Sequence, residues 1–302
     1  MYSQKIYIII VSYNGMNWID QCLKSCGDYP VIVVDNASAD DTVGFIEQQF
    51  PNVTLLKQDT NLGFGQANNL GVSYALNHGA KQVFLLNQDA YLEETTITQM
   101  VEVHKQYPEY GVLSPMHLNG RGDTLDYNFL NYIKRSKTFL TDCFLPQKST
   151  NKNHLVEIEF VNAALWLISK ECLKEVGGFN PYFFLYGEDR DYINRVHYKG
   201  FKLGVVLNTF GYHDRVQKDS ISKSQKIDTT LFEVQLLNPA SKVNFKDESI
   251  ILYKSFIKNL FRLKFNNCKR ILKKLNVLRS NLNELETYSS LSKSNKKFLY
   301  IK

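Results

Sequence analysis

Apolar runs and amphipathic segments alternate along the first third of the chain. Residues 6–11 and 31–34 are continuous apolar runs, typical of strands buried on both faces of a parallel sheet. Two more strands are expected at 53–57 and 83–86. The segments that follow each strand have helical spacing; they are 18–25, 38–50 with Ser38 as N-cap, 65–78 and 94–107. This alternation predicts an α/β fold, a mostly parallel central sheet with helices on both faces.

The pattern weakens in the middle of the chain and then resumes. Residues 118–153 begin polar and rich in Gly and Asn, which indicates a variable excursion. After it we expect a helix at 170–176, a turn at Gly177 and Gly178, a helix from Gly187 to Tyr198, and a strand at 201–207. The polar stretch 216–227 predicts a boundary. It divides the chain into a body, 1–220, and a helical extension, 221–302.

Charge divides the chain at the same boundary. The extension carries 17 Lys and Arg against 6 Asp and Glu, whereas the body carries 19 against 24. Nine basic residues and no acidic residue lie between positions 250 and 283, where apolar residues follow helical steps. Two interpretations stay open. The extension packs on the body with a solvated basic face, or it docks on an anionic membrane.

Several classes of protein are disfavoured. No apolar run approaches the ~18 residues of a membrane span, and the first apolar run lacks the basic flank of a signal peptide. The five cysteines are scattered, which suits a reducing compartment, so we expect a cytoplasmic protein. The basic extension has no recognised nucleic-acid motif, so no nucleic acid is expected as a partner.

Polar side chains follow the predicted strands where a parallel sheet binds ligands, at the carboxyl ends. Tyr13 follows the first strand, Asp35 ends the second, and Asn87 and Asp89 follow the fourth. A carboxylate at such a position can hold a divalent cation that neutralises a departing phosphate. The alternative for Asp89 is an ordinary turn residue that caps the next helix.

A second acidic group lies at the start of the helix near residue 188. Glu188, Asp189 and Asp191 repel one another, which raises at least one pKa and suits a general base. Alternatively, these acids only stabilise the helix N-terminus, and Asp191 pairs with Arg195 one turn later. His213, after the late strand, is a candidate metal ligand or phosphate contact, or a structural histidine.

A glycine-containing loop follows the third strand. Gly63 and Gly65 form a G-x-G, but they follow the third strand instead of the first, and Asn68 replaces the closing glycine of the dinucleotide-binding fingerprint. The glycines could instead allow the backbone to approach a nucleotide closely.

Taken in order, these pieces resemble glycosyltransferase family 2, whose members have the GT-A fold, over residues 5–215. The matching segments are Val11-Ser12-Tyr13-Asn14, the stretch 34–40 around Asp35, the loop 61–69, Asn87-Gln88-Asp89 in place of D-x-D, Gly177-Gly178-Phe179, and Glu188-Asp189-Arg190-Asp191.

The resemblance implies specific roles. Asp35 would contact the nucleotide base, Asp89 would bind Mg or Mn with His213 as a further metal contact, and Asp189 would be the general base. The other implied donor-site residues are Val11, Tyr13, Gly63, Asn68 and Asn87, and the implied acceptor-side residues are Glu188 and Asp191.

The implied activity is inverting, metal-dependent transfer of one sugar in cell-surface polysaccharide synthesis, similar to that of rhamnosyltransferases. The donor would be a UDP-, dTDP- or GDP-linked sugar, and the acceptor a glycan or polyprenyl-linked glycan. Such enzymes often work at the inner face of the cytoplasmic membrane, which suits the basic extension. The Q-x-x-R-W motif of processive synthases is absent, which favours single-sugar transfer.

Two other functions compete with this one. Asn87 stands where the family has the first Asp of D-x-D, which favours a non-catalytic nucleotide-sugar-binding protein. A nucleotidyltransferase would share the sheet but would need a Gly-rich basic loop after the first strand, and no basic residue occurs there before Lys24.

Overall fold

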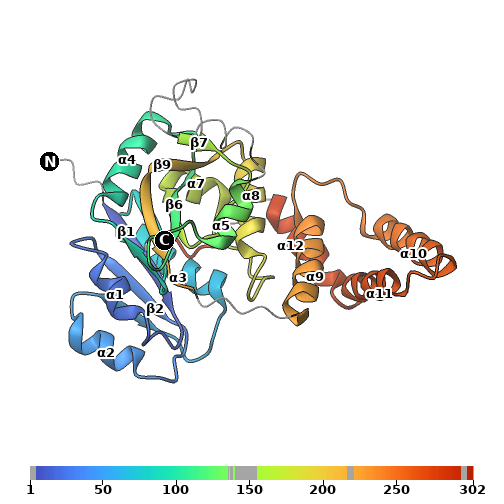
Figure 1. Cartoon of the computed structure of the whole chain (residues 1–302), viewed down its shortest axis with the longest axis horizontal. Helices are drawn as coiled ribbons and strands as arrows, with labels where there is room; N and C mark the ends of the chain where they lie inside the picture. Colours follow the sequence, from blue (N-terminus) through green and yellow to red (C-terminus); the bar gives the residue numbers. More distant parts are fainter. Residues whose placement is uncertain are drawn as a thin grey trace.

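The computed structural model describes residues 5–134, 136, 139, 155–215, 221–293 and 298–301, with side chains of the helix at 221–237 only from residue 228. A nine-stranded sheet forms the centre of the body, in the order β3-β2-β1-β4-β8-β6-β9-β5, with β7 paired to β9 (Figure 1). The strands are β1 (Ile6–Ser12), β2 (Val31–Asp35), β3 (Thr54–Lys57), β4 (Gln82–Asn87), β5 (Ala90–Leu92), β6 (Val112–Asn119), β7 (Leu155–Glu157), β8 (Leu165–Ser169) and β9 (Leu203–His213).

Helices cover both faces of this sheet and form the C-terminal extension (Figure 1). They are α1 (Ile19–Lys24), α2 (Thr42–Gln49), α3 (Phe64–Asn77), α4 (Thr96–Gln106), α5 (Tyr127–Ile133), α7 (Lys170–Val176), α8 (Glu188–Tyr198), α9 (Ile221–Leu237), α10 (Phe245–Phe261), α11 (Phe265–Ser280) and α12 (Leu282–Lys293).

The predicted β-α alternation is confirmed in the N-terminal half, where β3, β2, β1 and β4 run parallel. Alternate residues of β1 explain its continuous apolar run. Ile9 packs in the cluster that includes α3, while Ile8 and Ile10 pack in the cluster on the other face with α1. Each fully buried side chain of this size contributes roughly 1.5–3 kcal/mol to folding.

The second half of the sheet is less regular than the sequence suggested. Strand β8 runs antiparallel between β4 and β6, and neither β5 nor β6 was predicted. The late strand was expected to end at residue 207 but continues to His213. Of the predicted excursion, residues 140–154 lie outside the described residues, as do 216–220 of the predicted boundary.

The prediction that Ser38 caps α2 is wrong. The helix begins at Thr42, after Asp41, while the Ser38 hydroxyl donates to Asp35 Oδ1 at 2.6 Å. The Ser38 backbone N–H donates to Asp35 Oδ2 at 3.0 Å. A capping Ser would accept from a free N–H at the helix start, whereas here the Ser38 hydroxyl and N–H both donate to the charged carboxylate of Asp35, and hydrogen bonds to a charged group are the stronger ones.

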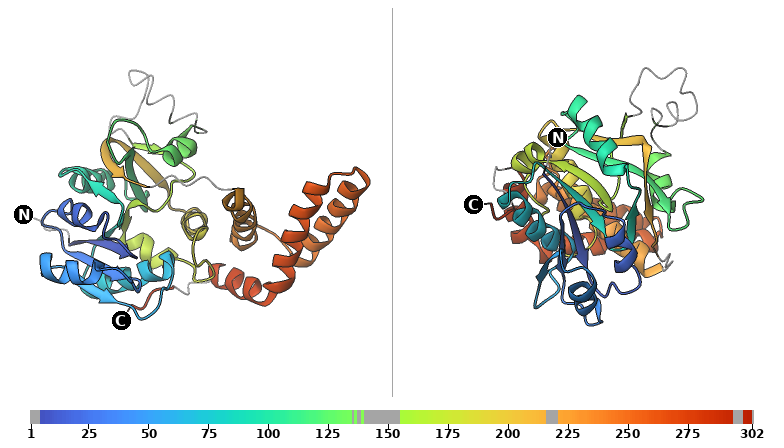
Figure 2. Two further views of the ribbon diagram at one scale, coloured as in Figure 1. Left: turned by 60° about the horizontal axis from the view of Figure 1, so that its bottom comes forward. Right: turned by 90° about the vertical axis from the view of Figure 1, so that its left-hand side faces the viewer.

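The extension has a small core of its own. Helices α9 to α12 project from the body, and their buried residues pack together with Phe183 of the body (Figure 2). The last described residues return to the body, where the Tyr300 N–H donates to Ser73 Oγ at 2.9 Å. Within the described parts of the chain, no helix is long and apolar enough to cross a bilayer.

Candidate active site

Three strand ends bring the predicted donor-side residues to one edge of the sheet. Strand β1 lies between β2 and β4, with Ser12 opposite Asp35 and Val11 opposite both Val34 and Asn87. Asp89 follows β4 by two residues. The prediction that these segments converge is therefore confirmed for the ends of β1, β2 and β4.

Asp35 is buried at this edge, with 2% of its surface exposed. Its Oδ1 accepts from the hydroxyls of Ser12, at 2.9 Å, and Ser38. The carboxylate thus fixes the turn after β2 against the end of β1. Its contact with a nucleotide base stays a prediction, made through the acceptor capacity that remains on Oδ2.

Gln88 connects the end of β1 to the segment that resembles D-x-D. Its Oε1 accepts from the Tyr13 N–H at 2.9 Å, and its Nε2 donates to the Tyr13 carbonyl at 3.2 Å. Tyr13 remains 47% exposed as a residue, so its ring is available to stack on a planar ligand. Asn87 Oδ1 is buried and accepts no hydrogen bond from any described residue.

The loop at Gly63 contacts another loop of the protein. Gly63 has a φ of +78°, and a Cβ there would lie 2.1 Å from the carbonyl oxygen of Phe184. Asn36 Nδ2 donates to Asn61 Oδ1 at 2.9 Å and binds this loop to the end of β2. The glycine therefore allows close approach to the loop before α8, and the approach of this backbone to a nucleotide stays a prediction.

Two asparagines at the start of α3 are buried. Asn68 donates to the Phe64 carbonyl at 3.0 Å, inside its own helix. The neighbouring Asn69, which the sequence analysis passed over, accepts from the Phe179 N–H at 2.7 Å and donates to its carbonyl at 2.8 Å. This pair of bonds fixes the Gly178–Phe179 segment to α3.

The predicted metal residues lie together. His213 Nε2 is 3.3 Å from Asp89 Oδ1, and Arg215 Nη2 donates to His213 Nδ1 at 2.7 Å. Burial alone would raise the pKa of Asp89, but the hydrogen bond with His213 and the charge of Arg215 outweigh it, so the pKa is lowered. Asp89 is therefore ionised at neutral pH and suited to a cation.

The residues present fit a divalent cation only in part. The described residues contain no cluster of three His, Cys, Asp or Glu side chains that could hold a metal. Asp89, with 24% of its side chain exposed, and the unpartnered Oδ1 of Asn87 are oxygen donors of the kind that Mg and Mn prefer. Since Arg215 donates to Nδ1, a neutral His213 carries its proton on Nε2 and would ligate a metal only after losing it.

The three acids of α8 have separate environments. Asp191 is fully buried, and its Oδ2 accepts from Arg195 Nε at 2.9 Å. Arg195 also donates to the carbonyls of Val176 and Gly178. The assignment of Asp191 to the acceptor side is corrected, because this carboxylate belongs to a buried ion pair that fastens α8 to the end of α7.

Glu188 and Asp189 have raised pKa values, as the spacing predicted for at least one acid. Burial, followed by the charge of Asp189, raises the pKa of Glu188 from 4.5 to about 8. Burial also raises the pKa of Asp189, partly offset by its hydrogen bond from the Arg190 N–H at 2.7 Å. A half-buried carboxylate with a raised pKa is a stronger base than an exposed one.

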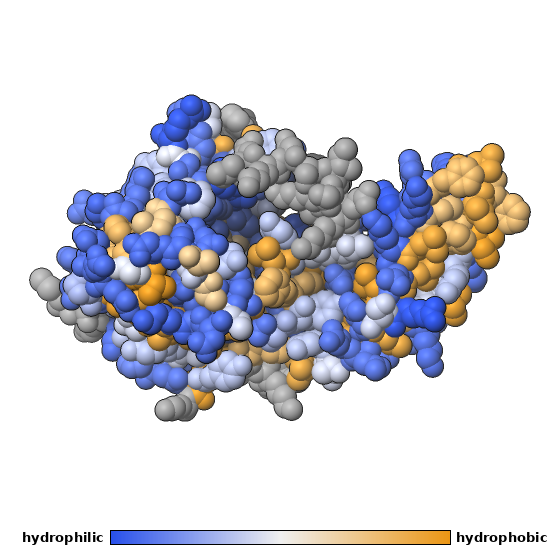
Figure 3. All heavy atoms as spheres, turned by 90° about the horizontal axis from the view of Figure 1, so that it is seen from below, coloured by the Kyte–Doolittle hydropathy of each residue, from blue (hydrophilic) through white to orange (hydrophobic). Residues whose placement is uncertain are grey.

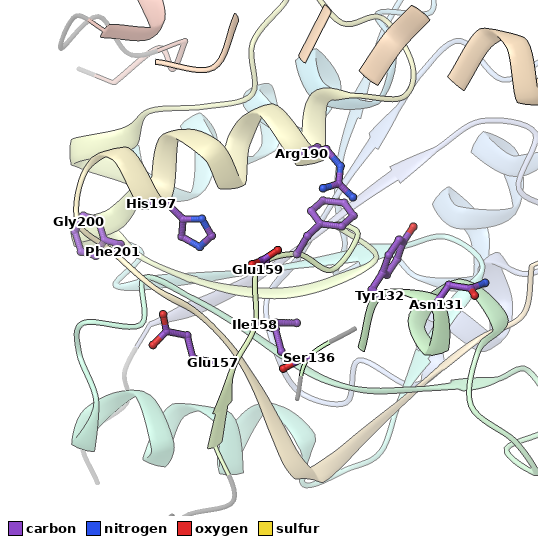
Figure 4. Close-up of a pocket in the computed structure, with 11 residues that line it drawn as sticks. Asn131, Tyr132, Ser136, Glu157, Ile158, Glu159, Arg190, His197, Gly200 and Phe201 are labelled. Atoms are coloured by element: carbon purple, nitrogen blue, oxygen red, sulfur yellow. The ribbon is translucent and has the colours of Figure 1, made fainter. Parts of the chain in front are cut away.

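A cavity of about 840 Å³ extends along α8 (Figure 4). Tyr132 and Arg190 stand at one end, with His197 and Phe201 at the other (Figure 4). The guanidinium of Arg190 lies 3.8 Å from the ring centroid of Phe160. No sequence signal pointed to this cavity, because α5 and residues 157–160 supply about half of its lining and lie in or beside the irregular segment.

Helix α5, which carries Tyr132, relates the two candidate carboxylates, Asp89 beside His213 and Asp189 at the start of α8. Burial raises the pKa of Tyr132 to about 12, followed by the charge of Asp189, while Arg215 and Arg190 act in the opposite direction. Arg215 contacts His213 beside Asp89 and pairs with Asp126, the N-cap of α5. Asp189 directly precedes Arg190, which lines the cavity together with Tyr132 of α5. Contacts from both candidate carboxylates therefore lead to α5 and this cavity.

Known proteins share this sequence pattern. The profile of a family described as "Glycosyl transferase family 2" matches residues 7–177. The low-salt glycan biosynthesis hexosyltransferase Agl10 of Haloferax volcanii is 23% identical over 228 residues, covering 75% of this chain and 69% of that protein. An N-acetylglucosaminyl-diphospho-decaprenol L-rhamnosyltransferase of Mycobacterium tuberculosis is 23% identical over 212 residues, covering 63% and 69%.

Solved structures share the fold. TarS of S. aureus in complex with UDP superposes with a TM-score of 0.53 at 15% identity, over 94% of this chain and 75% of that one. GalNAc-T7 with UDP, GalNAc and Mn2+ superposes with a TM-score of 0.60 at 13% identity, over 92% and 57%. Since the family profile covers more than half of the residues, the chain belongs to glycosyl transferase family 2 and is a glycosyltransferase with the GT-A fold.

Proposed function

We propose that the protein transfers one sugar from a nucleotide-diphosphate donor to a hydroxyl group of a glycan or lipid-linked glycan, with inversion at the anomeric carbon. The observation that supports this most directly is the series of contacts from Asp89 through His213, Arg215 and Asp126 to α5, whose Tyr132 lines the same cavity as Arg190, the residue after Asp189. One carboxylate on the side away from the diphosphate is enough for a single displacement, so no covalent intermediate is needed.

In this proposal Asp189 is the catalytic base. Its carboxylate accepts the proton of the acceptor hydroxyl as the oxygen forms a bond to the anomeric carbon and the bond to the diphosphate oxygen breaks. The Arg190 N–H donates to Oδ1 and holds the carboxylate in place for the acceptor. Glu188 is buried beside Asp189, and it affects the reaction by influencing the charge and the position of the Asp189 carboxylate.

The donor side is formed by the sheet edge and the loop at Gly63. Tyr13 offers an exposed ring and Asp35 an acceptor for the base, while Val11, Gly63 and Asn68 shape the backbone around them. Asp89 and Asn87, with His213 beside them, would hold Mg or Mn. A bound cation of this kind neutralises negative charge on a leaving diphosphate.

The identity of the ligands is suggested by similar proteins. TarS has been solved with UDP-GlcNAc, and the mannosyltransferase PcManGT of Pyrobaculum calidifontis with GDP-Man and Mn2+. We therefore keep UDP-, dTDP- and GDP-linked sugars as candidate donors. The mycobacterial relative's name specifies a decaprenol-diphosphate acceptor, which favours a polyprenyl-linked acceptor here and a peripheral site of action at the inner face of the cytoplasmic membrane.

A non-catalytic nucleotide-sugar-binding protein is the second candidate. It is favoured by Asn87 at the first D-x-D position and by the incomplete set of metal ligands in the described residues. It predicts binding of the donor without turnover.

A ligand screen followed by a turnover assay separates the two candidates. Thermal unfolding is measured with UDP-, dTDP- and GDP-sugars, with and without Mn, because binding to the native state raises the melting temperature. The sugar that stabilises the protein is then incubated with it, and release of the nucleoside diphosphate is followed with and without acceptor. Stabilisation with release supports the transferase, and stabilisation without release in any condition supports the binding protein.

A further inference from the structure

The helical extension ends in an exposed apolar surface. Helices α10 and α11 form a hairpin that projects from the body, and its far end carries hydrophobic side chains (Figure 3). We call four of them the apolar tip: Leu260, Phe261, Leu263 and Phe265, whose exposed fractions are 45%, 85%, 73% and 57%. Ile257 and Leu272 continue this surface along the two helices, at 51% and 49%. Removing this much apolar surface from water is favourable, so an exposed cluster of this kind marks a site of interaction.

The turn at the tip favours this interpretation. Leu263 has a φ of +54°, a left-handed backbone conformation that costs a residue other than Gly or Asn free energy. Its side chain gains nothing in return within the described residues, because it is 73% exposed. A leucine with a strained backbone and a side chain in water indicates that this side chain packs against a partner other than the described residues.

The charges around the tip identify the partner. Lys258, Arg262, Lys264 and Lys269 are exposed, and none forms an ion pair with an acidic side chain in the described parts of the chain. Between positions 250 and 283 there are nine basic residues and no acidic one. Apolar side chains with basic neighbours match an anionic bilayer, in which headgroups meet the cations and acyl chains receive the apolar groups.

A second copy of the chain fits this surface less well. Two tips placed face to face would bring together two basic clusters without a neutralising acid. The body of the same chain is not available either, since the hairpin points away from it (Figure 2).

We propose that the apolar tip inserts into the interfacial region of an anionic phospholipid bilayer, with Lys258, Arg262, Lys264 and Lys269 at the level of the headgroups. The hairpin is then the element that fixes the protein at the membrane, and the catalytic body is held beside the surface where a lipid-linked acceptor would be exposed. This inference deepens the peripheral location proposed above, but binding of the tip to lipid requires neither donor nor acceptor.

Sedimentation with vesicles tests the proposal on the full chain. Wild-type protein should bind vesicles of phosphatidylethanolamine and phosphatidylglycerol, and bind pure phosphatidylcholine vesicles at least about tenfold more weakly. Phe261→Ser with Leu263→Ser should lower the partition coefficient on anionic vesicles at least about tenfold. Lys258→Glu with Lys264→Glu should also weaken binding and reduce its dependence on salt. Phe261 and Leu263 are both exposed, so the double serine variant should melt at the wild-type temperature or slightly above.

A fluorescent reporter tests insertion itself. Phe261→Trp should show a blue shift on anionic vesicles, whereas Tyr300→Trp, at a position 72% exposed and remote from the hairpin, should not.

Unchanged vesicle binding by the serine variant, or no shift of the Trp at position 261, would overturn the proposal. A wild-type dimer that the serine variant converts to monomers, without vesicle binding by either, would assign the tip to self-association instead. The serine variant should bind the donor as tightly as wild type, so failure of the sugar transfer and failure of lipid binding are separate results.

Discussion

Arg215 donates to Nδ1 of His213 across 2.7 Å and so directs the other ring nitrogen, Nε2, toward Asp89 Oδ1 at 3.3 Å. A guanidinium has no acceptor atom, so the bond fixes both the orientation of the ring and the nitrogen that carries its proton. The other side of Arg215 pairs with Asp126 at 3.1 Å, and Asp126 caps α5 through the Phe129 N–H. The candidate metal carboxylate is therefore coupled to the helix that contributes Tyr132 to the cavity.

The first prediction concerns this connection. Arg215→Gln should release His213, whose Nε2–H then no longer holds the carboxylate of Asp89 in place. This should raise the Mn concentration needed for half-maximal activity by about 10- to 100-fold, the usual effect of losing a residue that orients a metal ligand. Donor affinity without metal should change much less. The matched control is Arg121→Gln, which removes only an exposed pair with Asp123 at 3.4 Å. Equal metal titrations for wild type and Arg215→Gln would remove Arg215 from the site.

Asp89 should be required for the response to metal. Asp89→Ala removes the half-buried carboxylate at the sheet edge, so the gain in donor affinity on adding Mn should largely disappear. Calorimetric titration of the nucleoside diphosphate with Mn and with EDTA measures this gain. If the variant retains the wild-type gain, the cation binds elsewhere.

Asp189 and Asp191 should behave differently although they are two residues apart. Asp189→Asn should lower the rate of transfer by about 10²- to 10⁴-fold, the usual contribution of a general base, with donor affinity nearly unchanged. Asp191→Asn should instead destabilise the fold by about 3–5 kcal/mol, because it leaves Arg195 buried without its counter-charge. Single-turnover kinetics and urea unfolding distinguish the two effects. A wild-type rate for Asp189→Asn would exclude it as the base.

The raised pKa of Glu188 predicts a pH dependence of stability. Because burial raises its pKa from 4.5 to about 8, the folded state binds a proton that the unfolded state releases. The stability that this proton contributes is complete below pH 4.5 and is lost as the pH rises to about 8. Asp189, also raised, acts in the same direction.

Glu188→Gln removes this pH dependence and leaves that of Asp189. The free energy of unfolding of wild type should fall relative to that of the variant between pH 4.5 and 8, by on the order of a few kcal/mol. Urea unfolding of both proteins across that range measures the difference. Parallel curves would show that folding leaves the pKa of Glu188 unchanged.

The donor side of the site could be predicted because its geometry follows from local pattern. Buried parallel strands end at a common edge, so Asp35, Asn87 and Asp89 had to lie near one another once β1, β2 and β4 were recognised. The candidate base was also predicted, since acids grouped at a helix start are visible in the sequence.

The cavity side could not be predicted in the same way. Tyr132 lies in the irregular segment, and Arg190 and His197, which line the cavity with it, are far from it in sequence. Asp191 was misassigned because spacing alone does not reveal which helix face is buried; burial and Arg195 decide it. Gly63 was interpreted from its motif, whereas its close contact is with a loop more than a hundred residues away.

That contact gives the last prediction. At Gly63 a side chain would meet two penalties, a φ of +78° and a Cβ 2.1 Å from the carbonyl oxygen of Phe184, a backbone atom that cannot rotate away. Gly27 offers a matched control, since its φ is +55° but nothing lies within 4 Å of a Cβ. Gly27→Ala should therefore cost only the conformational penalty, about 1–2 kcal/mol. Gly63→Ala should cost clearly more, because the loop must also move away from Phe184 and so separate the donor side from the segment that leads into α8. Urea unfolding gives the two stabilities, and donor affinity should fall for Gly63→Ala alone. Equal losses of stability for the two variants, with unchanged donor binding, would mean that the contact between these loops positions neither side of the site.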